Sequence, residues 1–123
     1  MKRDMDLIRE ILIKLEELPT YNKQVEIEIE GYSSELTQYQ LTLLSEAKFI
    51  EVPDDGTSKA FVGNANITPS RLTMTGHDFL EAIRNKNVWK KTKDFIAKNG
   101  GGFVLTTVRD IAVGYLRKEM GLS

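Results

Sequence analysis

The sequence predicts an α+β fold in which helices pack with a small antiparallel sheet. Three observations support this class. Residues 34–48 show the apolar spacing of a helix and run almost without a loop into the apolar residues of a strand at 49–52. A second strand is expected at residues 71–75, and it feeds directly into another helix. Residues 54–70 between them are polar and contain Gly and Asn repeatedly, which predicts a long connecting loop.

Composition limits the class of protein. A length of 123 residues, with 41% hydrophobic and 28% charged residues, is typical of one soluble globular domain that buries its own core. The absence of cysteine excludes a disulfide scaffold, a thiolate metal site and a cysteine nucleophile. The first 18 residues are charged throughout, unlike a signal peptide, and no run approaches the ~20 apolar residues that span a bilayer. We therefore expect a cytoplasmic protein without membrane contact.

Charge is unevenly distributed along the chain, although the formal net charge is only −1. Residues 1–60 contain 7 Lys/Arg and 13 Asp/Glu, whereas residues 61–123 contain 10 and 5. This asymmetry indicates a charged partner on the C-terminal side. The near-neutral total argues against strong nonspecific binding to nucleic acid, because that affinity grows with the number of phosphates neutralised.

The N-terminal region predicts one helix and one strand. A helix is expected at residues 4–18, where Pro19 ends it and where apolar residues recur on one face: Leu7, Ile8, Ile11, Leu12, Leu15 and Leu18. Residues 24–30 alternate strictly, with Val25, Ile27 and Ile29 on one side and three glutamates on the other, which is typical of a half-buried strand. The glutamates are evenly spaced and do not converge, so a solvated face is expected rather than a metal site.

Ser33 or Ser34 is expected to cap the helix at residues 34–48 by accepting a hydrogen bond from a free backbone N–H. The face expected to be buried, with Leu41 at its flank, consists of Leu36, Tyr39, Leu43, Leu44 and Ala47. The face expected to point outward consists of Thr37, Gln38, Gln40, Thr42 and Ser45. Gln and Thr suit hydrogen bonds to base edges, but they suit an ordinary hydrated helix surface equally well. Glu35 and Glu46 would repel phosphate.

The region around the second strand holds the lone histidine. Only residues 60–62 within the long loop could form a further short strand. Thr75 is expected to cap the helix that follows, with Asp78 completing a weak capping box. His77 has no second histidine, cysteine or acid pair at ligand spacing, so we expect a surface residue rather than a catalytic or metal-binding one.

Two further helices are predicted in the C-terminal region. The first includes Val88, Trp89 and Ile96 and ends at residues 99–102. The second runs from about Thr106 or Thr107 to Met120. The densest basic cluster of the chain lies in the first of them: Lys86, Lys90, Lys91, Lys93 and Lys98. Such a cluster is typical of a solvated helix face or of an anionic contact. We expect residues 1–86 to form the main unit and residues 87–123 to form a two-helix extension packed on it.

The order of helix, strand, long loop, strand and helix resembles winged-helix proteins. Leu72-Thr73 followed by Gly76 and Phe79-Leu80 is similar to the end of the wing in many bacterial winged-helix regulators. The resemblance implies that the helix at residues 34–48 lies against DNA and that the two strands form the wing. Only residues 31–34 separate this helix from the preceding strand, so the first helix of a helix-turn-helix pair is missing or collapsed.

Motifs along nearly the whole chain are similar to a family of small, uncharacterised proteins that are common in bacteriophages and prophages. The opening MKRDMDLIR and the step Gly31-Tyr32-Ser33 match that family. Residues 71–84 match its RLT..GHDFL..IR motif, and the helix that contains Trp89, Lys90 and Lys93 matches its W.K.K motif. Gln40 stands where the family usually has histidine, so any role of that histidine is absent here. The family has no assigned activity.

No set of residues suggests catalysis. Acid–base chemistry needs positioned titratable groups, whereas the carboxylates here lie mostly on polar faces. A serine nucleophile needs a base, and the one histidine has no evident partner. We therefore expect a non-enzymatic protein that needs no cofactor and no metal.

Two functions are consistent with these patterns. The first is a winged-helix-like DNA-binding or DNA-associated regulatory protein of phage or prophage type that contacts double-stranded DNA. The residues expected at that contact are Thr37, Gln38 and Thr42 on bases, Lys59 and Arg71 from the wing, and Lys90, Lys91 and Lys93 on phosphates. The alternative is a protein–protein interaction module of the same shape that does not bind nucleic acid. Its last helix would then pack through Val108, Tyr115 and Leu116 on another protein or on a second copy in a homodimer.

Overall fold

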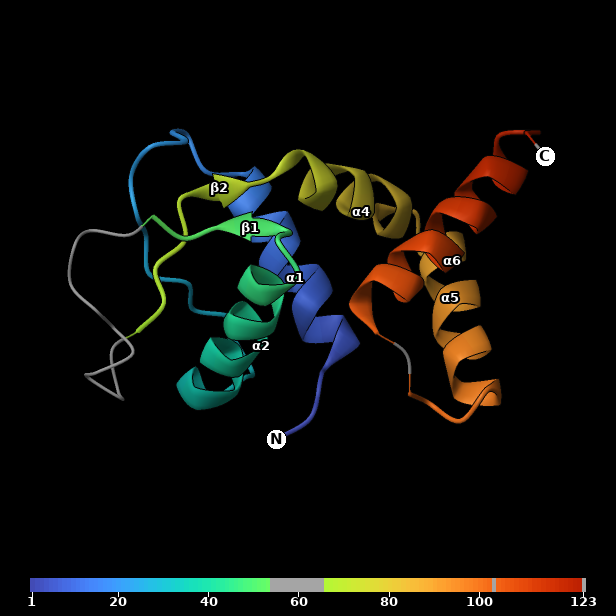
Figure 1. Ribbon diagram of the computed structural model, residues 1–123, viewed down its shortest axis with the longest axis horizontal. Coiled ribbons are helices and arrows are strands. Elements are labelled where there is room, and N and C mark those ends of the chain that lie inside the picture. Colours follow the sequence, from blue (N-terminus) through green and yellow to red (C-terminus); the bar gives the residue numbers. More distant parts are fainter. Residues whose placement is uncertain (54–65, 103, 123) are drawn as a thin grey trace.

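The computed structural model of the chain describes residues 1–53, 66–102 and 104–122, and it shows an α+β fold (Figure 1). The elements in chain order are α1 (Met5–Glu16), α2 (Ser34–Glu46), β1 (Ile50–Glu51), β2 (Arg71–Leu72), α4 (Met74–Arg84), α5 (Lys86–Lys98) and α6 (Leu105–Glu119). The two strands pair antiparallel, with Ile50 opposite Leu72. The predicted order of helix, strand, strand and helix is confirmed, although both strands are shorter than predicted. Lys59 and residues 60–62 lie outside the described residues.

Helix α1 contacts α2, α4 and β2 and so lies at the centre of the fold. Its N-cap is Asp4, whose carboxylate accepts a hydrogen bond from the Leu7 N–H at 3.0 Å. The predicted apolar face is buried: Leu7, Ile8, Ile11, Leu12 and Leu15. Leu18, predicted inside the helix, follows its end and packs half-buried against the core.

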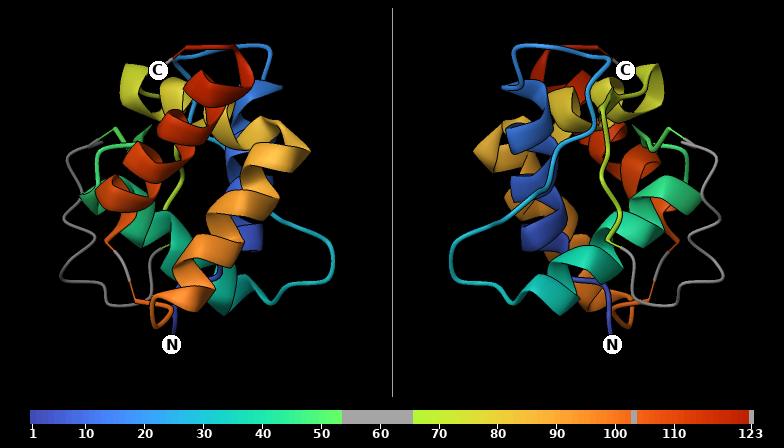
Figure 2. Two further views of the ribbon diagram at one scale, coloured as in Figure 1. Left: turned by 90° about the vertical axis from the view of Figure 1, so that its right-hand side faces the viewer. Right: turned by 90° about the vertical axis from the view of Figure 1, so that its left-hand side faces the viewer.

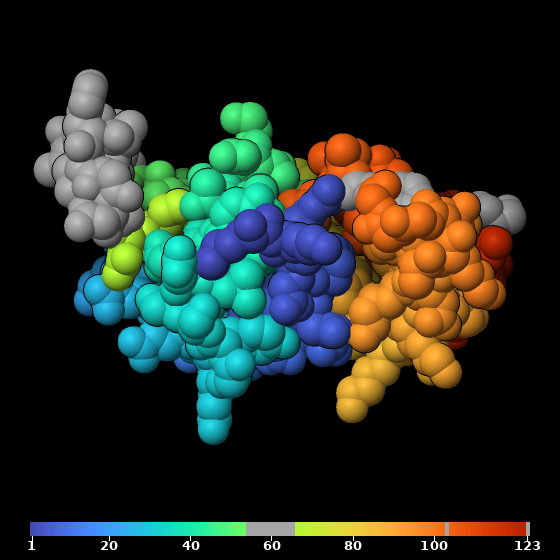
Figure 3. Space-filling view, turned by 90° about the horizontal axis from the view of Figure 1, so that it is seen from below, coloured from blue at the N-terminus to red at the C-terminus, as the bar shows by residue number. Residues whose placement is uncertain are grey.

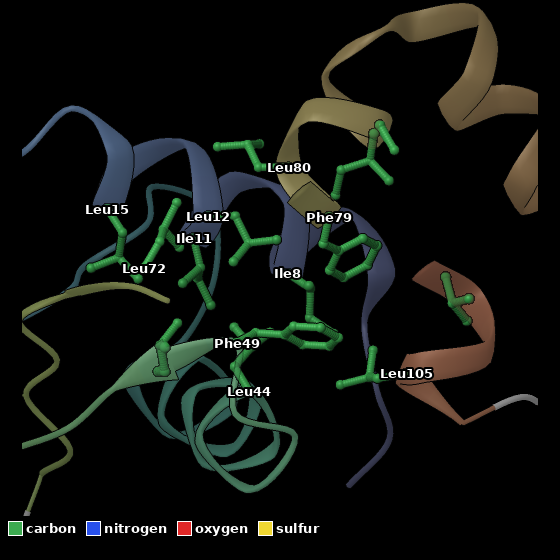
Figure 4. Packing of buried hydrophobic residues seen from close by; sticks show 14 of the residues in the cluster. Ile8, Ile11, Leu12, Leu15, Leu44, Phe49, Leu72, Phe79, Leu80 and Leu105 are labelled. Atoms are coloured by element: carbon green, nitrogen blue, oxygen red, sulfur yellow. The ribbon is translucent and has the colours of Figure 1, made fainter. Parts of the chain in front are cut away.

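The core lies where these helices meet the start of β1 (Figure 4). Phe49 and Phe79 contact each other with ring centroids 5.0 Å apart. Ile8 of α1, Leu44 of α2 and Leu105 of α6 belong to the same buried cluster. Burying each such side chain stabilises the fold by roughly 1.5–3 kcal/mol relative to leaving it exposed.

The junction between β1 and α4 depends on a close backbone contact. Thr73, and not the predicted Thr75, caps α4, because the helix begins before Thr75. The Thr73 hydroxyl accepts a hydrogen bond from the Gly76 N–H at 3.1 Å and donates to the Lys48 carbonyl at 2.7 Å. A Cβ on Gly76 would lie 2.0 Å from the carbonyl oxygen of Phe49, so a residue without a side chain is required there.

Helices α5 and α6 form an antiparallel pair beside α4 (Figures 1 and 2). Asn85 caps α5 by accepting hydrogen bonds from the N–H groups of Asn87 and Val88. The buried apolar residues of the pair belong to the same core as α1: Val88, Trp89, Leu105, Val108 and Ala112. The expected exposure of Val108 is therefore wrong, because this side chain faces the core.

The segment at residues 24–30, predicted as a strand, is extended but joins no sheet in the described part of the chain. Its alternation is as predicted, since Ile27 is buried, Val25 and Ile29 are half-buried and the three glutamates are exposed. The backbone of Val25 donates one hydrogen bond to Pro69 at 3.0 Å. A period of two identified the buried face of this segment but not a hydrogen-bond partner.

Candidate functional site

Helix α2 buries a different face from the predicted one. Its buried residues are Thr37, Gln40, Leu41 and Leu44, so two polar side chains lie in the interior. The more apolar set that was predicted to be buried, apart from Leu44, is only half-buried: Leu36, Tyr39, Leu43 and Ala47. Ser33, one of the two predicted caps, accepts a hydrogen bond from the Leu36 N–H at 3.1 Å.

The two buried polar side chains of α2 have hydrogen-bond partners. Gln40 accepts a hydrogen bond from the Asp4 N–H at 2.9 Å and donates one to the Lys2 carbonyl at 3.0 Å. Thr37 donates its hydroxyl hydrogen to the Ser33 carbonyl at 2.9 Å. A buried amide is tolerated when it is hydrogen-bonded in this way. The prediction that Thr37 and Gln40 point outward is wrong, because both side chains are buried. The two hydrogen bonds of Gln40 hold the N-terminal segment against α2.

The other two residues predicted to contact bases are also engaged inside the chain. Gln38 accepts a hydrogen bond from the Ile67 N–H at 2.6 Å. Thr42 donates its hydroxyl hydrogen to the Gln38 carbonyl at 2.9 Å. The exposed residues of α2 are Ser34, Glu35 and Glu46. The charge that α2 presents to solvent is therefore negative.

The half-buried side of α2 lines a surface groove of about 680 Å³. We call it the α2 groove, and its principal lining residues are Tyr39, Leu43 and Ala47 of α2, Val104 and Leu105 at the start of α6, and Lys2, Arg3 and Glu46. Figure 3 shows the N-terminal segment lying against α2 on this side of the molecule. Val104 is 60% exposed, so the groove combines accessible apolar surface with charged groups of both signs.

Sequence reasoning missed the α2 groove. The spacing of Tyr39, Leu43 and Ala47 was visible, but it predicted a buried stripe. Nothing local in the sequence places Lys2 or Val104 next to that stripe. The signal in the sequence was Leu41, which was expected only at the flank of the buried face and is fully buried in the structure.

The residues predicted to contact DNA from the wing and from α5 differ in their surroundings. Arg71 binds the carboxylate of Glu51, its neighbour across the two-stranded sheet. Lys91 pairs with Glu119 at 3.0 Å on the surface. Such exposed pairs are worth only about 0–1 kcal/mol and do not remove the lysine from solvent. The exposed lysines of α5 are Lys86, Lys90, Lys91 and Lys98.

Lys93 belongs to a contact that joins α5 to the start of α1. Its ammonium donates to the Asp6 carboxylate at 3.0 Å and lies 5.5 Å from the centroid of the Trp89 ring. The Trp89 indole N–H donates to the same carboxylate at 3.0 Å. Partial burial acts to raise the pKa of Asp6. The hydrogen bonds from Lys93 and Trp89, together with the charges of Lys93 and Arg9, outweigh it and hold that pKa below its ordinary value.

Titratable residues do not gather into a metal site in the part of the chain that the structure describes: no group of three or more His, Asp or Glu there could hold a metal ion. His77 is exposed in the first turn of α4, where it was predicted.

Comparison with known proteins identifies the family. A family model described as "Hypothetical protein (DUF2513)" matches residues 2–102. The chain belongs to the DUF2513 family. An uncharacterized protein of Haemophilus influenzae is 32% identical to this DUF2513 protein over 113 residues, which cover 91% of this chain and 92% of that protein. No solved structure matches the chain. The predicted membership of an uncharacterised family is thus confirmed. No helix within the described ranges is long and apolar enough to cross a membrane.

Proposed function

We propose that this DUF2513 protein is a non-enzymatic interaction module whose α2 groove binds a short amphipathic segment of another protein. The segment places apolar side chains against Tyr39, Leu43 and Val104, and it places acidic side chains beside Lys2 and Arg3. The observation that carries the proposal is the half-buried apolar stripe of α2.

A helix on a protein surface normally buries its most apolar face. In α2, Thr37 and Gln40 occupy the interior, while Tyr39 and Leu43 remain partly accessible. Covering apolar surface gains about 25 cal/mol per Å² removed from water. Contiguous exposed apolar surface on a soluble protein typically marks an interaction site, and laying an amphipathic helix into such a groove is a recurrent mode of peptide recognition.

The charges of the α2 groove select the chemistry of the partner. Lys2 and Arg3 contribute two positive charges, and Glu46 contributes one negative charge. Acidic side chains on the partner complement the two cations, and Glu46 repels them at its own position. Because like charges brought together in an interface cost several kcal/mol, this arrangement also sets the direction in which the segment binds.

A displayed library of helical peptides, selected against the full chain, tests this proposal. The expected winners combine Leu or Phe with Asp or Glu, and they perturb the NMR signals of Tyr39, Leu43 and Val104. Leu43→Glu weakens their binding by about tenfold or more. Met74→Glu is the matched control, because Met74 is 80% exposed on α4, outside the α2 groove, and its replacement leaves binding unchanged. Selection of basic peptides, or perturbations confined to another face, would contradict the proposal.

A second candidate is association with double-stranded DNA through α5. The observation that favours it is charge, since α5 contains five lysines and a single acid, Asp94. Such a surface contacts phosphates, which position a protein on DNA without reading its sequence. The predicted base contacts of α2 do not support specific reading, because Thr37 is buried and Gln38 is engaged with Ile67.

Fluorescence anisotropy with a labelled duplex tests the DNA candidate. Binding is expected to weaken with salt by a log–log slope of about −0.9 per phosphate contacted. Replacing Lys86, Lys90 and Lys98 together by Gln reduces the slope by about 3 units if each contacts a phosphate. Lys23→Gln serves as the control, since Lys23 lies far from α5 in the chain and is exposed. An unchanged slope in the triple variant would contradict this role for α5.

We propose that the α+β arrangement is a winged helix, with β1 and β2 as the base of the wing; the order of α2, β1, β2 and α4 supports it. An NMR structure of the full chain tests the winged-helix proposal. We also propose the phage or prophage association that the sequence motifs imply, and the genes that flank members of the family test it.

A further inference from the structure

The outward face of α6 carries charges in a symmetric arrangement. Asp110 and Arg117 lie on one face of the helix, on either side of Val113 and Gly114, at spacings of three and four residues. Asp110, Gly114 and Arg117 are exposed, and Val113 is half-buried. The left view of Figure 2 shows α6 beside α5 at the outside of the molecule. We call these four residues the α6 face.

We infer that the α6 face is the contact through which two copies of this chain associate about a two-fold axis. The point between Val113 and Gly114 is equally distant in sequence from Asp110 and Arg117. When two α6 helices cross antiparallel at this point, Asp110 of each copy lies beside Arg117 of the other. A two-fold interface requires such self-complementarity, because every contact in it occurs twice.

Gly114 fits the crossing point. A Cβ at this position would meet no atom within 4 Å, so the described part of the single chain gives no packing reason for a glycine there. Glycine inside a helix costs about 1 kcal/mol relative to alanine. In the paired arrangement, the missing side chain lets the two backbones approach closely and leaves room for Val113 of the other copy. Met120, which is 65% exposed, then faces Thr107 of the other copy in the same register.

Acidic residues around the α6 face attract Arg117 of the other copy. A groove of about 540 Å³ runs between α6 and α4, and Asp78 and Glu81 of α4 line it together with the α6 face. Arg109 contacts Asp110 at 3.0 Å within the chain, yet the Asp110 side chain remains 69% exposed. Exposed pairs of this kind are weak, so the Asp110 carboxylate remains available to a second cation.

Sedimentation velocity on the full chain, from about 1 µM to about 1 mM, tests the inference, because small interfaces give weak, concentration-dependent dimers. The wild-type protein is expected to shift from monomer to dimer within this range. Asp110→Arg and Arg117→Asp each place like charges opposite one another twice and are expected to weaken self-association about 100-fold or more. An equimolar mixture of the two variants restores every attractive pair, and it is expected to form heterodimers close to the wild-type affinity.

The mixture separates a true interface from damage to the fold, because two misfolded chains do not rescue each other. Gly114→Leu is a second variant, since it keeps an exposed helix intact while blocking close approach. Glu35→Lys, a charge reversal on α2, is the control and leaves self-association unchanged. A wild-type protein that stays monomeric up to about 1 mM, variants that still dimerise, or a mixture that stays monomeric would each overturn the inference.

Discussion

At Gly76, a single missing Cβ determines how α4 meets β1. The position that a Cβ would take lies 2.0 Å from the Phe49 carbonyl oxygen, and that oxygen also accepts the Thr73 N–H at 3.0 Å. A methyl group at position 76 therefore forces the backbone of Phe49 or of α4 to shift. Gly76→Ala is therefore expected to destabilise the protein by about 2–4 kcal/mol.

Urea denaturation measures this effect, and Gly114 supplies the matched control. Gly114→Ala adds the same methyl group to a helix at a site where no atom lies within 4 Å. It is expected to stabilise the monomer by up to about 1 kcal/mol, because alanine is the better helix former. Equal effects of the two substitutions would show that the close contact at Gly76 does not matter.

Asp6 gives the protein a pH-dependent contact. The hydrogen bonds and charges around this carboxylate lower its pKa in the folded state. Its stabilising contribution is therefore complete above the unfolded pKa and is lost as pH falls through the lower, folded pKa, in the range below about pH 4. Asp6 is largely exposed and screened, so the contribution is a fraction of about 1 kcal/mol.

The comparison of wild type with Asp6→Asn across pH measures this contribution. The variant is expected to be less stable near pH 7, and the difference is expected to vanish as the medium becomes strongly acidic. Asp78→Asn, which removes an exposed acid on α4, controls for net charge. A difference that stays constant over the whole pH range would contradict the assignment to Asp6.

Among the helices and strands, the pattern of neighbouring residues predicted those features that depend on neighbouring residues alone. The apolar spacing of α1 and its stop at Pro19 predicted a helix within two residues at its C-terminal end. The rotation of α2 was not predictable, because the partners of Gln40 are the backbone groups of Lys2 and Asp4, which lie 36 or more residues away in the chain. The same applies to residues 24–30, whose lack of a ladder depends on how distant segments pair.

Gln40→Leu tests whether Gln40 holds the N-terminal segment against α2. It leaves the Asp4 N–H and the Lys2 carbonyl without their side-chain partner, and it is expected to cost about 1–3 kcal/mol. Hydrogen exchange at the Asp4 amide is expected to become faster as the N-terminal segment loosens. Gln38→Leu is the matched control, because it should speed exchange at Ile67 and not at Asp4. Unchanged hydrogen exchange at the Asp4 amide in Gln40→Leu would contradict the conclusion that Gln40 holds the N-terminal segment in place.

For the whole molecule, the charge asymmetry of the sequence has a partly internal explanation. The acidic N-terminal half and the basic C-terminal half meet through Asp6–Lys93, Glu16–Arg84 and Glu51–Arg71. Some of the charge that predicted an external partner is therefore neutralised within the fold. The exposed lysines of α5 and the cations of the α2 groove remain at the surface, where the proposed contacts use them.

Site-specific photocrosslinking in cells shows whether the α2 groove binds a segment of another protein. A benzophenone side chain replaces Leu43 in cells that carry the gene, and the same group at the exposed Glu26 serves as the control. We expect a discrete adduct from position 43 alone, and we expect mass spectrometry to locate the attached group in an amphipathic protein segment that combines apolar and acidic side chains. Attachment to DNA, attachment to a basic segment, or equal labelling from both positions would contradict the proposal.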